Sequence, residues 1–372
     1  MKRLESVTPF LVMDILKEAK EKQDVVHMEI GEPDLEPPPG VIHALEKAVK
    51  DRLFYYTPSL GIWELRERIA KHYYDRFGVE VSPSRVVITS GTSSAFLVVY
   101  AILLDFGNRI VLSDPTYPCY KNFAYILGAE PVVVNTDAST GYQIKPEHLL
   151  ELKDYQALHI STPANPTGAV YDEENLKALA QFCEERNIHF VCDEIYQGLT
   201  YDREERTALE FSHKAIVING FSKSFCMPGF RLGWVILPHE EWVRKAELVL
   251  QNLYISAPTL SQYSALQAFD YQYLSKVKET YRKRRDMLLE ELKGIGRIDK
   301  KPEGAFYVWV DVSQYGVDSY ELSMALLRDA KVAVTPGVDF GKNKTERYIR
   351  LSFARDGNLL EGVRRIRSYL MR

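Results

Sequence analysis

The chain has 372 residues, of which 46% are hydrophobic and 26% are charged, as is usual for a soluble globular enzyme. Its formal net charge of −4 gives no basic footprint for nucleic acid and argues against a membrane-surface protein. The longest apolar run, residues 95–104, is far shorter than the ~20 residues of a spanning helix, so we expect no transmembrane segment.

The N-terminus begins with basic residues but has no apolar core behind them, so it does not predict a signal peptide. The four cysteines form no CxxC pair and indicate no disulfide framework. A reducing cytoplasm is therefore the expected location. Because the histidines are also dispersed, we expect no metal site.

The first elements are helical. The apolar pattern predicts a helix over residues 8–24, and further helices over 41–52 and 62–77. Between the first two, the segment Gly31 to Gly40 contains three consecutive prolines, which exclude regular structure.

The middle of the chain alternates between short β-branched runs and helical stretches such as 93–104 and 173–186. Because these runs are apolar on both faces, they predict central strands of a sheet covered by helices, that is, an α/β fold with a mostly parallel, seven-stranded sheet. The expected strands are 86–89, 109–113, 131–135, 157–161, 188–193, 215–219 and 233–237.

The C-terminal part predicts a smaller α+β unit. Residues 260–293 lack Pro and Gly, which favours one long helix, and its RKRR cluster at 282–285 is interpreted as a solvated face. The remaining expected elements are strands 305–311, 332–335 and 347–353 and helices 319–329 and 357–371. We therefore expect a large domain of residues 41–275 and a small domain built from 1–40 and 276–372.

A lysine follows one of the predicted strands. Lys223 lies in the segment GFSKSF, in a loop at the carboxyl end of strand 215–219, where α/β sheets build their sites. A desolvated lysine has a lowered pKa and can form a Schiff base. An ordinary loop lysine is the alternative.

Three further loops follow strands in the same way. Asp193 ends the apolar strand IHFVCD, so its carboxylate needs a partner such as a protonated cofactor nitrogen, with a helix N-cap as the alternative. The loop STPANPTG presents the amide of Asn165. The small residues of TSGTSSA, residues 89–95, open a helix and suit an anion, although neither GxGxxG nor a P-loop is present.

Together these segments resemble the class I/II aminotransferases, which are fold type I pyridoxal 5′-phosphate enzymes. The resemblance covers essentially the whole chain and keeps the order of ten motifs and the spacing of eight from Lys223 to Arg231. Cys226 departs from the family signature but occupies no proposed catalytic position. The ten motifs are GEPD (31–34), YTPSLG (56–61), SGTSSA (90–95), DPTYP (114–118), PANPTG (163–168), DEIY (193–196), SKSFCMPGFRLG (222–233), GAFY (304–307), PGVDFG (336–341) and RLSFA (350–354).

The resemblance implies that pyridoxal 5′-phosphate is the cofactor. Lys223 would bind it as a Schiff base and then move a proton between the substrate α-carbon and the cofactor. Asp193 would pair with the protonated pyridine nitrogen. Tyr196 and Asn165 would hydrogen-bond its phenolic oxygen, and Tyr117 would stack on its ring.

The resemblance also implies a phosphate site formed by Thr92, Ser93, Ser222 and Arg231. Tyr56 would reach the phosphate bound by the neighbouring subunit, which implies an obligate homodimer.

For the substrate, the resemblance implies that Arg350 grips the α-carboxylate with a bidentate fork. Gly31 would let the backbone approach the substrate closely, and Asn165 would also contact it. The alternative for Arg350 is a surface residue on an edge strand.

Four functions are alternatives for this sequence. The first is transamination between an L-amino acid and a 2-oxo acid, and the second is β-elimination by a carbon–sulfur lyase on the same scaffold. A non-catalytic DNA-binding regulator would need an added module, for which GEPD at residue 31 leaves no room at the N-terminus. A nicotinamide-dependent dehydrogenase is opposed by the missing glycine fingerprint. Transamination is the function we expect.

The sequence also bears on the substrate. A dicarboxylic amino acid needs a second cation, yet the segment QNLYISAPTLSQYS, residues 251–264, contains no Arg or Lys, and Ser93 stands where a phosphate-loop lysine could. We therefore expect a neutral or aromatic amino acid, or alanine, with 2-oxoglutarate and glutamate as the second pair. The aromatic residues of this neighbourhood are Phe10, Tyr55, Tyr117, Tyr120 and Tyr307.

Overall fold

The structure is a computed structural model, and it describes residues 2–371. Its centre is a seven-stranded sheet with the strand order β2-β8-β7-β6-β5-β3-β4. The sheet is mostly parallel, because only β8 runs antiparallel to its neighbours β7 and β2. The strands are β2 (Val86–Thr89), β3 (Arg109–Asp114), β4 (Glu130–Asn135), β5 (Ala157–Ser161), β6 (His189–Asp193), β7 (Ile216–Gly220) and β8 (Gly233–Ile236).

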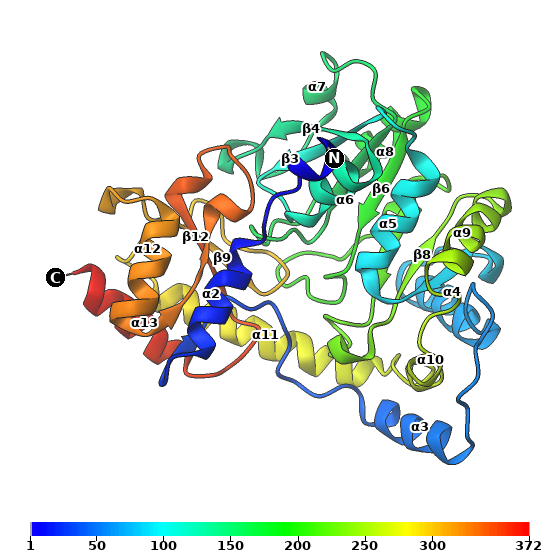
Figure 1. Cartoon of the computed structure of the whole chain (residues 1–372), viewed down its shortest axis with the longest axis horizontal. Coiled ribbons are helices and arrows are strands. Elements are labelled where there is room, and N and C mark those ends of the chain that lie inside the picture. The colour runs from blue at the N-terminus through cyan, green and yellow to red at the C-terminus, as the bar shows by residue number, and fades with distance from the viewer. Residues whose placement is uncertain (1, 372) are drawn as a thin grey trace.

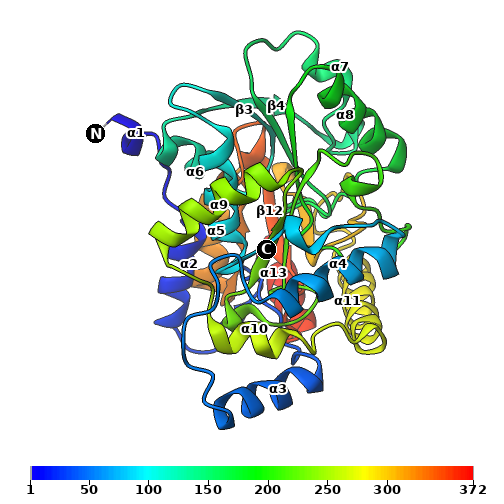
Figure 2. The same ribbon diagram turned by 90° about the vertical axis from the view of Figure 1, so that its right-hand side faces the viewer.

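Helices cover both faces of this sheet, which explains why its strands are apolar on both sides (Figures 1 and 2). Along β7, Ile216 and Ile218 pack into one core while Val217 packs into the other. The first core includes α5 (Gly91–Leu103), α6 (Cys119–Leu127) and α9 (Glu240–Leu253). The second includes α4 (Trp63–Phe77), α7 (Pro146–Leu149), α8 (Glu173–Glu185) and α10 (Thr259–Ala265). The predicted α/β fold is confirmed.

A smaller unit joins segments from both ends of the chain. The antiparallel sheet β11-β12-β9 consists of Thr335–Pro336, Tyr348–Ser352 and Tyr307–Asp311. Beside it, β1 (Val26–His27) pairs in parallel with β10 (Val332–Ala333). Its helices are α2 (Leu11–Lys20), α12 (Ser319–Ala325), which continues in a wider turn over Leu326–Ala330, and α13 (Leu359–Leu370). The domain boundaries 41–275 against 1–40 with 276–372 stay a prediction.

Helix ends account for most differences from the sequence expectation. The single strand expected over 332–335 is wrong, because β10 and β11 belong to different sheets. The structure has α1 (Lys2–Glu5), α2 is shorter than the expected 8–24, and α3 covers Pro39–Lys50. The single helix expected over 260–293 is wrong, because α10 ends at Ala265 and α11 (Tyr271–Glu291) begins separately. The Asp270 carboxylate accepts the Tyr273 N–H at 3.0 Å and so starts α11 without any proline or glycine.

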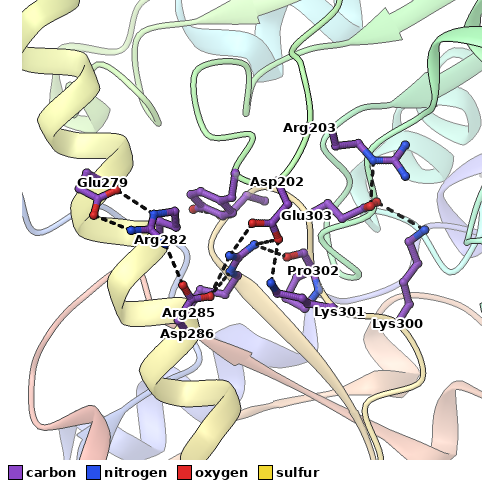
Figure 3. A network of polar contacts seen from close by, with 12 residues as sticks. Asp202, Arg203, Glu279, Arg282, Arg285, Asp286, Lys300, Lys301, Pro302 and Glu303 are labelled. Atoms are coloured by element: carbon purple, nitrogen blue, oxygen red, sulfur yellow. Dashed lines mark hydrogen bonds and ion pairs between the residues drawn. The ribbon is translucent and has the colours of Figure 1, made fainter.

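The solvated-face interpretation of the RKRR cluster is wrong for Arg284 and Arg285. Arg285 is fully buried and donates both terminal nitrogens to Asp202, at 2.6 and 3.0 Å, and one of them also to the Pro302 carbonyl (Figure 3). Arg284 pairs with Asp34. Only Arg282 and Lys283 stay on the outer side of α11. Charge alone therefore mispredicted two side chains that the helical period turns inward.

Candidate active site

Eleven of the sequence-predicted site residues line a single cavity of about 310 Å³. It lies where the carboxyl ends of β5, β6 and β7 face the three-stranded sheet, because parallel strands bring the loops that follow them to the same edge. These residues are Gly31, Thr92, Ser93, Tyr117, Asn165, Asp193, Tyr196, Ser222, Lys223, Arg231 and Arg350. The twelfth, Tyr56, is not among the lining residues and is 77% exposed.

Lys223 lies three residues beyond the end of β7. Its Nζ donates to the Gly31 carbonyl at 2.6 Å and lies over the rings of Phe306 and Tyr196, 5.6 and 5.7 Å from their centroids. Burial, followed by the nearby Arg350 guanidinium, lowers the pKa of Lys223 to about 8. This environment differs from that of an ordinary loop lysine, because the lowered pKa leaves a larger fraction of the amine neutral, and therefore nucleophilic, near pH 7.

Asp193 ends β6 and is 2% exposed. One carboxylate oxygen accepts the Ile195 N–H at 3.0 Å, and the other accepts the Tyr120 hydroxyl. Burial raises the pKa of Asp193 to about 6, against these hydrogen bonds and the charge of Lys223, which lower it. A carboxylate held this way suits a cationic partner, which would offset the cost of burying its charge.

Arg350 is buried, at 4% exposed, and lies on β12, the central strand of its sheet, so the edge-strand alternative is wrong. Its guanidinium donates to the Asn165 side-chain oxygen at 2.9 Å and to the Glu29 carbonyl at 2.6 Å. The rings of Tyr307 and Phe340 lie 4.2 and 4.8 Å from it. Its Nε is buried without a hydrogen-bond partner. A cation so enclosed is suited to an anionic substrate group.

An anion cradle is built around the start of α5. A Cβ atom on Gly91 would lie 2.6 Å from Nη2 of Arg231, so glycine is what lets the guanidinium approach the helix N-terminus. The φ of Gly91 is +76°, which also favours glycine. The side chains of Thr92 and Ser93 line the cavity beside it. A helix N-terminus, hydroxyl groups and an arginine together fit a dianionic phosphate.

Gly31 is required for a similar reason. A Cβ atom there would lie 1.8 Å from the Tyr307 hydroxyl oxygen, which hydrogen-bonds to the Tyr196 hydroxyl at 2.7 Å. Glycine at this position therefore permits the close approach of the Tyr196–Tyr307 pair to the backbone carbonyl that accepts from Lys223.

Sequence reasoning missed several contributors. Tyr120 was expected only as part of an aromatic neighbourhood, yet it is the hydroxyl donor to Asp193. Its place three residues after Tyr117, in a turn where its N–H bonds to the Tyr117 carbonyl at 3.2 Å, could have signalled a shared face. Val12, Met13 and Leu16 of α2 also line the cavity, and the apolar side of a helix gives no sign of what it covers.

Comparison with known proteins identifies this arrangement. The family model "Aminotransferase class I and II" matches residues 23–366. The chain belongs to this family. The aminotransferase is 38% identical to a (5-formylfuran-3-yl)methyl phosphate transaminase of Methanocaldococcus jannaschii, over 99% of each chain. It is 37% identical to a valine–pyruvate aminotransferase of Mycobacterium tuberculosis, over 98% of this chain and 97% of that one.

Solved structures agree with this assignment. A crystal structure of an aminotransferase from Mycobacterium tuberculosis superposes with a TM-score of 0.94 at 36% identity, covering 99% of this chain and 98% of that one. An aspartate aminotransferase from Thermus thermophilus, solved with maleate, gives a TM-score of 0.92 at 31% identity, covering 98% of each.

The aminotransferase is therefore a pyridoxal-phosphate-dependent enzyme that moves an amino group between an amino acid and a 2-oxo acid. The cavity fits that cofactor, since it joins a lysine of lowered pKa, a buried carboxylate and an anion cradle. Among residues 2–371, no helix is long and apolar enough to cross a membrane, and no group of three or more His, Cys, Asp or Glu side chains could hold a metal.

Proposed function

We propose that the aminotransferase acts on an L-amino acid with a neutral or aromatic side chain, or on alanine, and passes its amino group to 2-oxoglutarate. The observation that carries this proposal is the charge inventory of the cavity. Within the part of the chain that the structure describes, its only cations are Lys223, Arg231 and Arg350, and each is needed elsewhere in the site. The distal carboxylate of aspartate, held close to the reacting carbon by a short side chain, would lack a partner and would be costly to bury. The chain of 2-oxoglutarate is one methylene longer and can extend its distal carboxylate further toward solvent.

We propose that residues at both ends of the cavity bind the cofactor. Thr92, Ser93, Ser222 and Arg231 bind its phosphate at the start of α5, and Lys223 forms the covalent link. This assignment rests on the approach of Arg231 to Gly91 and on the lowered pKa of Lys223.

At the other end of the cofactor, Asp193 keeps the ring nitrogen protonated, while Asn165 and Tyr196 donate to the phenolic oxygen. Tyr117, which lines the same wall, packs against the ring. Pyridoxal phosphate supplies a conjugated ring that accepts the electron pair left when the α-proton departs.

The protein's residues then bind and orient the substrate. Arg350 takes the α-carboxylate, for which its fork is prepared by the Asn165 side-chain oxygen and the Glu29 carbonyl. The Tyr307 hydroxyl takes the room left by the missing Cβ of Gly31, so the substrate would approach the Gly31 backbone itself. Lys223, released as a neutral amine when the substrate amino group takes its place, would remove the α-proton and deliver it to the cofactor carbon to which the lysine had been linked. The rings of Tyr117 and Tyr307 and the α2 side chains keep water from the reacting atoms.

The names of the relatives support neutral substrates only in part. Valine and pyruvate are the substrates named for the Mycobacterium tuberculosis relative, whereas aspartate is named for the relative from Pyrococcus horikoshii, at 32% identity. The preference proposed here rests instead on the charge inventory of the cavity, and the apolar residues that line it, among them Phe10, Met13 and Leu16, agree with it.

We further propose that the enzyme is a homodimer in which Tyr56 reaches the phosphate bound by the neighbouring subunit. Tyr56 belongs to an exposed apolar segment in which Phe54, Tyr55 and Trp63 are 61%, 84% and 48% exposed. Monomers rarely leave so many adjacent aromatic side chains uncovered, so this segment favours an interface.

A cytoplasmic location is proposed from the cysteines. All four are free, and Cys183, Cys192 and Cys226 are buried as small apolar residues. Unpaired thiols suit a reducing compartment.

The test of the substrate preference is kcat/KM for aspartate against alanine, methionine, phenylalanine and tyrosine, each with 2-oxoglutarate. We expect at least one neutral amino acid to exceed aspartate by tenfold or more, about 1.4 kcal/mol of transition-state preference. A tenfold preference for aspartate would show a distal cation and contradict the proposal. Pyruvate and ammonia released from cystathionine would instead indicate a carbon–sulfur lyase.

A further inference from the structure

Helix α2 lacks a cap of its own. The residue before it, Phe10, offers no side-chain acceptor, so the first N–H groups of the helix need a partner from elsewhere. Asp339 supplies it from 328 residues further along the chain. Its two carboxylate oxygens accept the N–H of Leu11 at 3.0 Å and of Val12 at 3.3 Å.

The helix that Asp339 caps forms one wall of the active-site cavity. Val12, Met13 and Leu16 line the cavity, as does Phe10 just before the helix. The Phe10 ring meets the edge of Tyr117 with 6.1 Å between centroids. Helix α2 packs against β10 and β11, and β11 pairs with β12, which carries Arg350.

The segment that carries Asp339 also contacts the substrate-binding arginine. The next residue, Phe340, places its ring 4.8 Å from the Arg350 guanidinium, and its carbonyl accepts the Thr116 N–H at 2.9 Å, next to Tyr117. Asp339 itself is 4% exposed. The wall formed by α2 is therefore tied to the same short segment that packs against Arg350.

We propose that Asp339 is a positioning residue that sets the distance between helix α2 and Arg350, and thereby the space for the substrate side chain. This inference rests on the proposed function, in which Arg350 binds the α-carboxylate. A substrate held there directs its side chain toward the apolar wall of α2. Binding of amino acids with large apolar side chains should therefore depend on where this wall lies, whereas binding of alanine, with its single methyl group, should not.

The test compares Asp339→Ala with wild type in the reaction of bound cofactor with alanine, methionine and phenylalanine. Loss of a helix cap typically corresponds to roughly a fivefold change in an equilibrium. We expect KM for phenylalanine and methionine to rise about fivefold or more, with kcat changed less, and both constants for alanine to stay within twofold. Cofactor absorbance and affinity should equal those of wild type.

Three further variants separate positioning from a general loss of stability. Asp172→Ala removes an equivalent cap, from α8, whose residues do not line the cavity, and should leave the substrate preference unchanged. Leu11→Pro removes one of the two donors while keeping Asp339, at a helical position that tolerates proline, and should reproduce part of the selective loss. Asp339→Asn keeps one acceptor oxygen and should lie between Asp339→Ala and wild type.

The inference would be overturned if KM in Asp339→Ala changed equally for alanine and phenylalanine, or did not change at all. The same selective change of KM in Asp172→Ala would also overturn it. If Asp339→Ala does not fold, Leu11→Pro decides by the same criterion. A wild-type enzyme that reacts with no amino acid would refute the proposed function instead, so the two failures are distinguishable.

Discussion

Burial sets the protonation of both titratable groups at the centre of the site. It lowers the pKa of Lys223 to about 8 and raises that of Asp193 to about 6, and in each case desolvation of the charged form is the largest cause. A buried carboxylate suits a cationic ring, and an amine whose pKa lies near physiological pH suits a covalent link.

The lysine prediction concerns pH. Only the neutral amine attacks an aldehyde, and its fraction grows as pH rises through the pKa. Covalent capture of pyridoxal phosphate by apoenzyme should therefore accelerate up to about pH 8 and then level off, rather than continue toward the 10.5 of an ordinary lysine. Borohydride trapping should place the label on the peptide containing Lys223, with Lys223→Ala as the control. A rate still rising at high pH, or a label on another lysine, would refute the assignment.

The carboxylate prediction concerns charge. Asp193→Asn leaves an amide that cannot stabilise a pyridinium, and loss of a buried charge partner costs on the order of 3–5 kcal/mol. We expect transamination to slow at least a hundredfold. Tyr120→Phe, which removes only the hydroxyl donor and keeps the charge, should cost roughly tenfold or less. An Asn variant within fivefold of wild type would remove Asp193 from this role.

At the scale of elements, patterns that depend on neighbouring residues were predictable. The seven strands follow from short apolar runs, and the loops after β5, β6 and β7 follow from the general placement of sites in α/β sheets. The features that could not be predicted depend on particular hydrogen-bond partners, several of them distant in the sequence. Asp270 begins a helix inside a segment free of breakers, and Asp339 caps α2 across the whole chain. Likewise, the helical period places Arg285 on the buried face of α11, but nothing local identifies Asp202 as the partner that makes its burial possible.

Arg285 and Arg282 provide a matched pair on α11. Arg285→Ala removes a fully buried guanidinium and takes a donor from the Pro302 carbonyl (Figure 3). Asp202 loses two hydrogen bonds and keeps its ion pair with Lys301. We expect the free energy of unfolding to fall by roughly 3 kcal/mol, less than for a wholly buried pair because Asp202 is partly exposed. Arg282→Ala breaks only exposed pairs with Glu279 and Asp286 and should cost below about 1 kcal/mol. Equal losses in denaturant unfolding would contradict this account.

At the scale of the whole molecule, the cavity lies between two sheets. In the proposed homodimer, Tyr56 of each subunit completes the cavity of the other. Tyr56→Ala and Lys223→Ala chains should each be nearly inactive as homodimers. Hybrids of the two contain one intact site, with Lys223 from one chain and Tyr56 from the other. After dissociation and random re-association, about one quarter of wild-type activity should return. Activity that does not recover, although the mixture sediments as dimers, would show that Tyr56 serves no neighbouring site.

Transfer of the amino nitrogen tests the central claim most directly. The enzyme is incubated with unlabelled 2-oxoglutarate and, one at a time, ¹⁵N-labelled alanine, methionine, phenylalanine, tyrosine and aspartate. The account predicts ¹⁵N-glutamate from at least one neutral amino acid, more slowly from aspartate, and from none of them with Lys223→Ala. Label found in free ammonium rather than glutamate, or no transfer from any neutral amino acid, would contradict it.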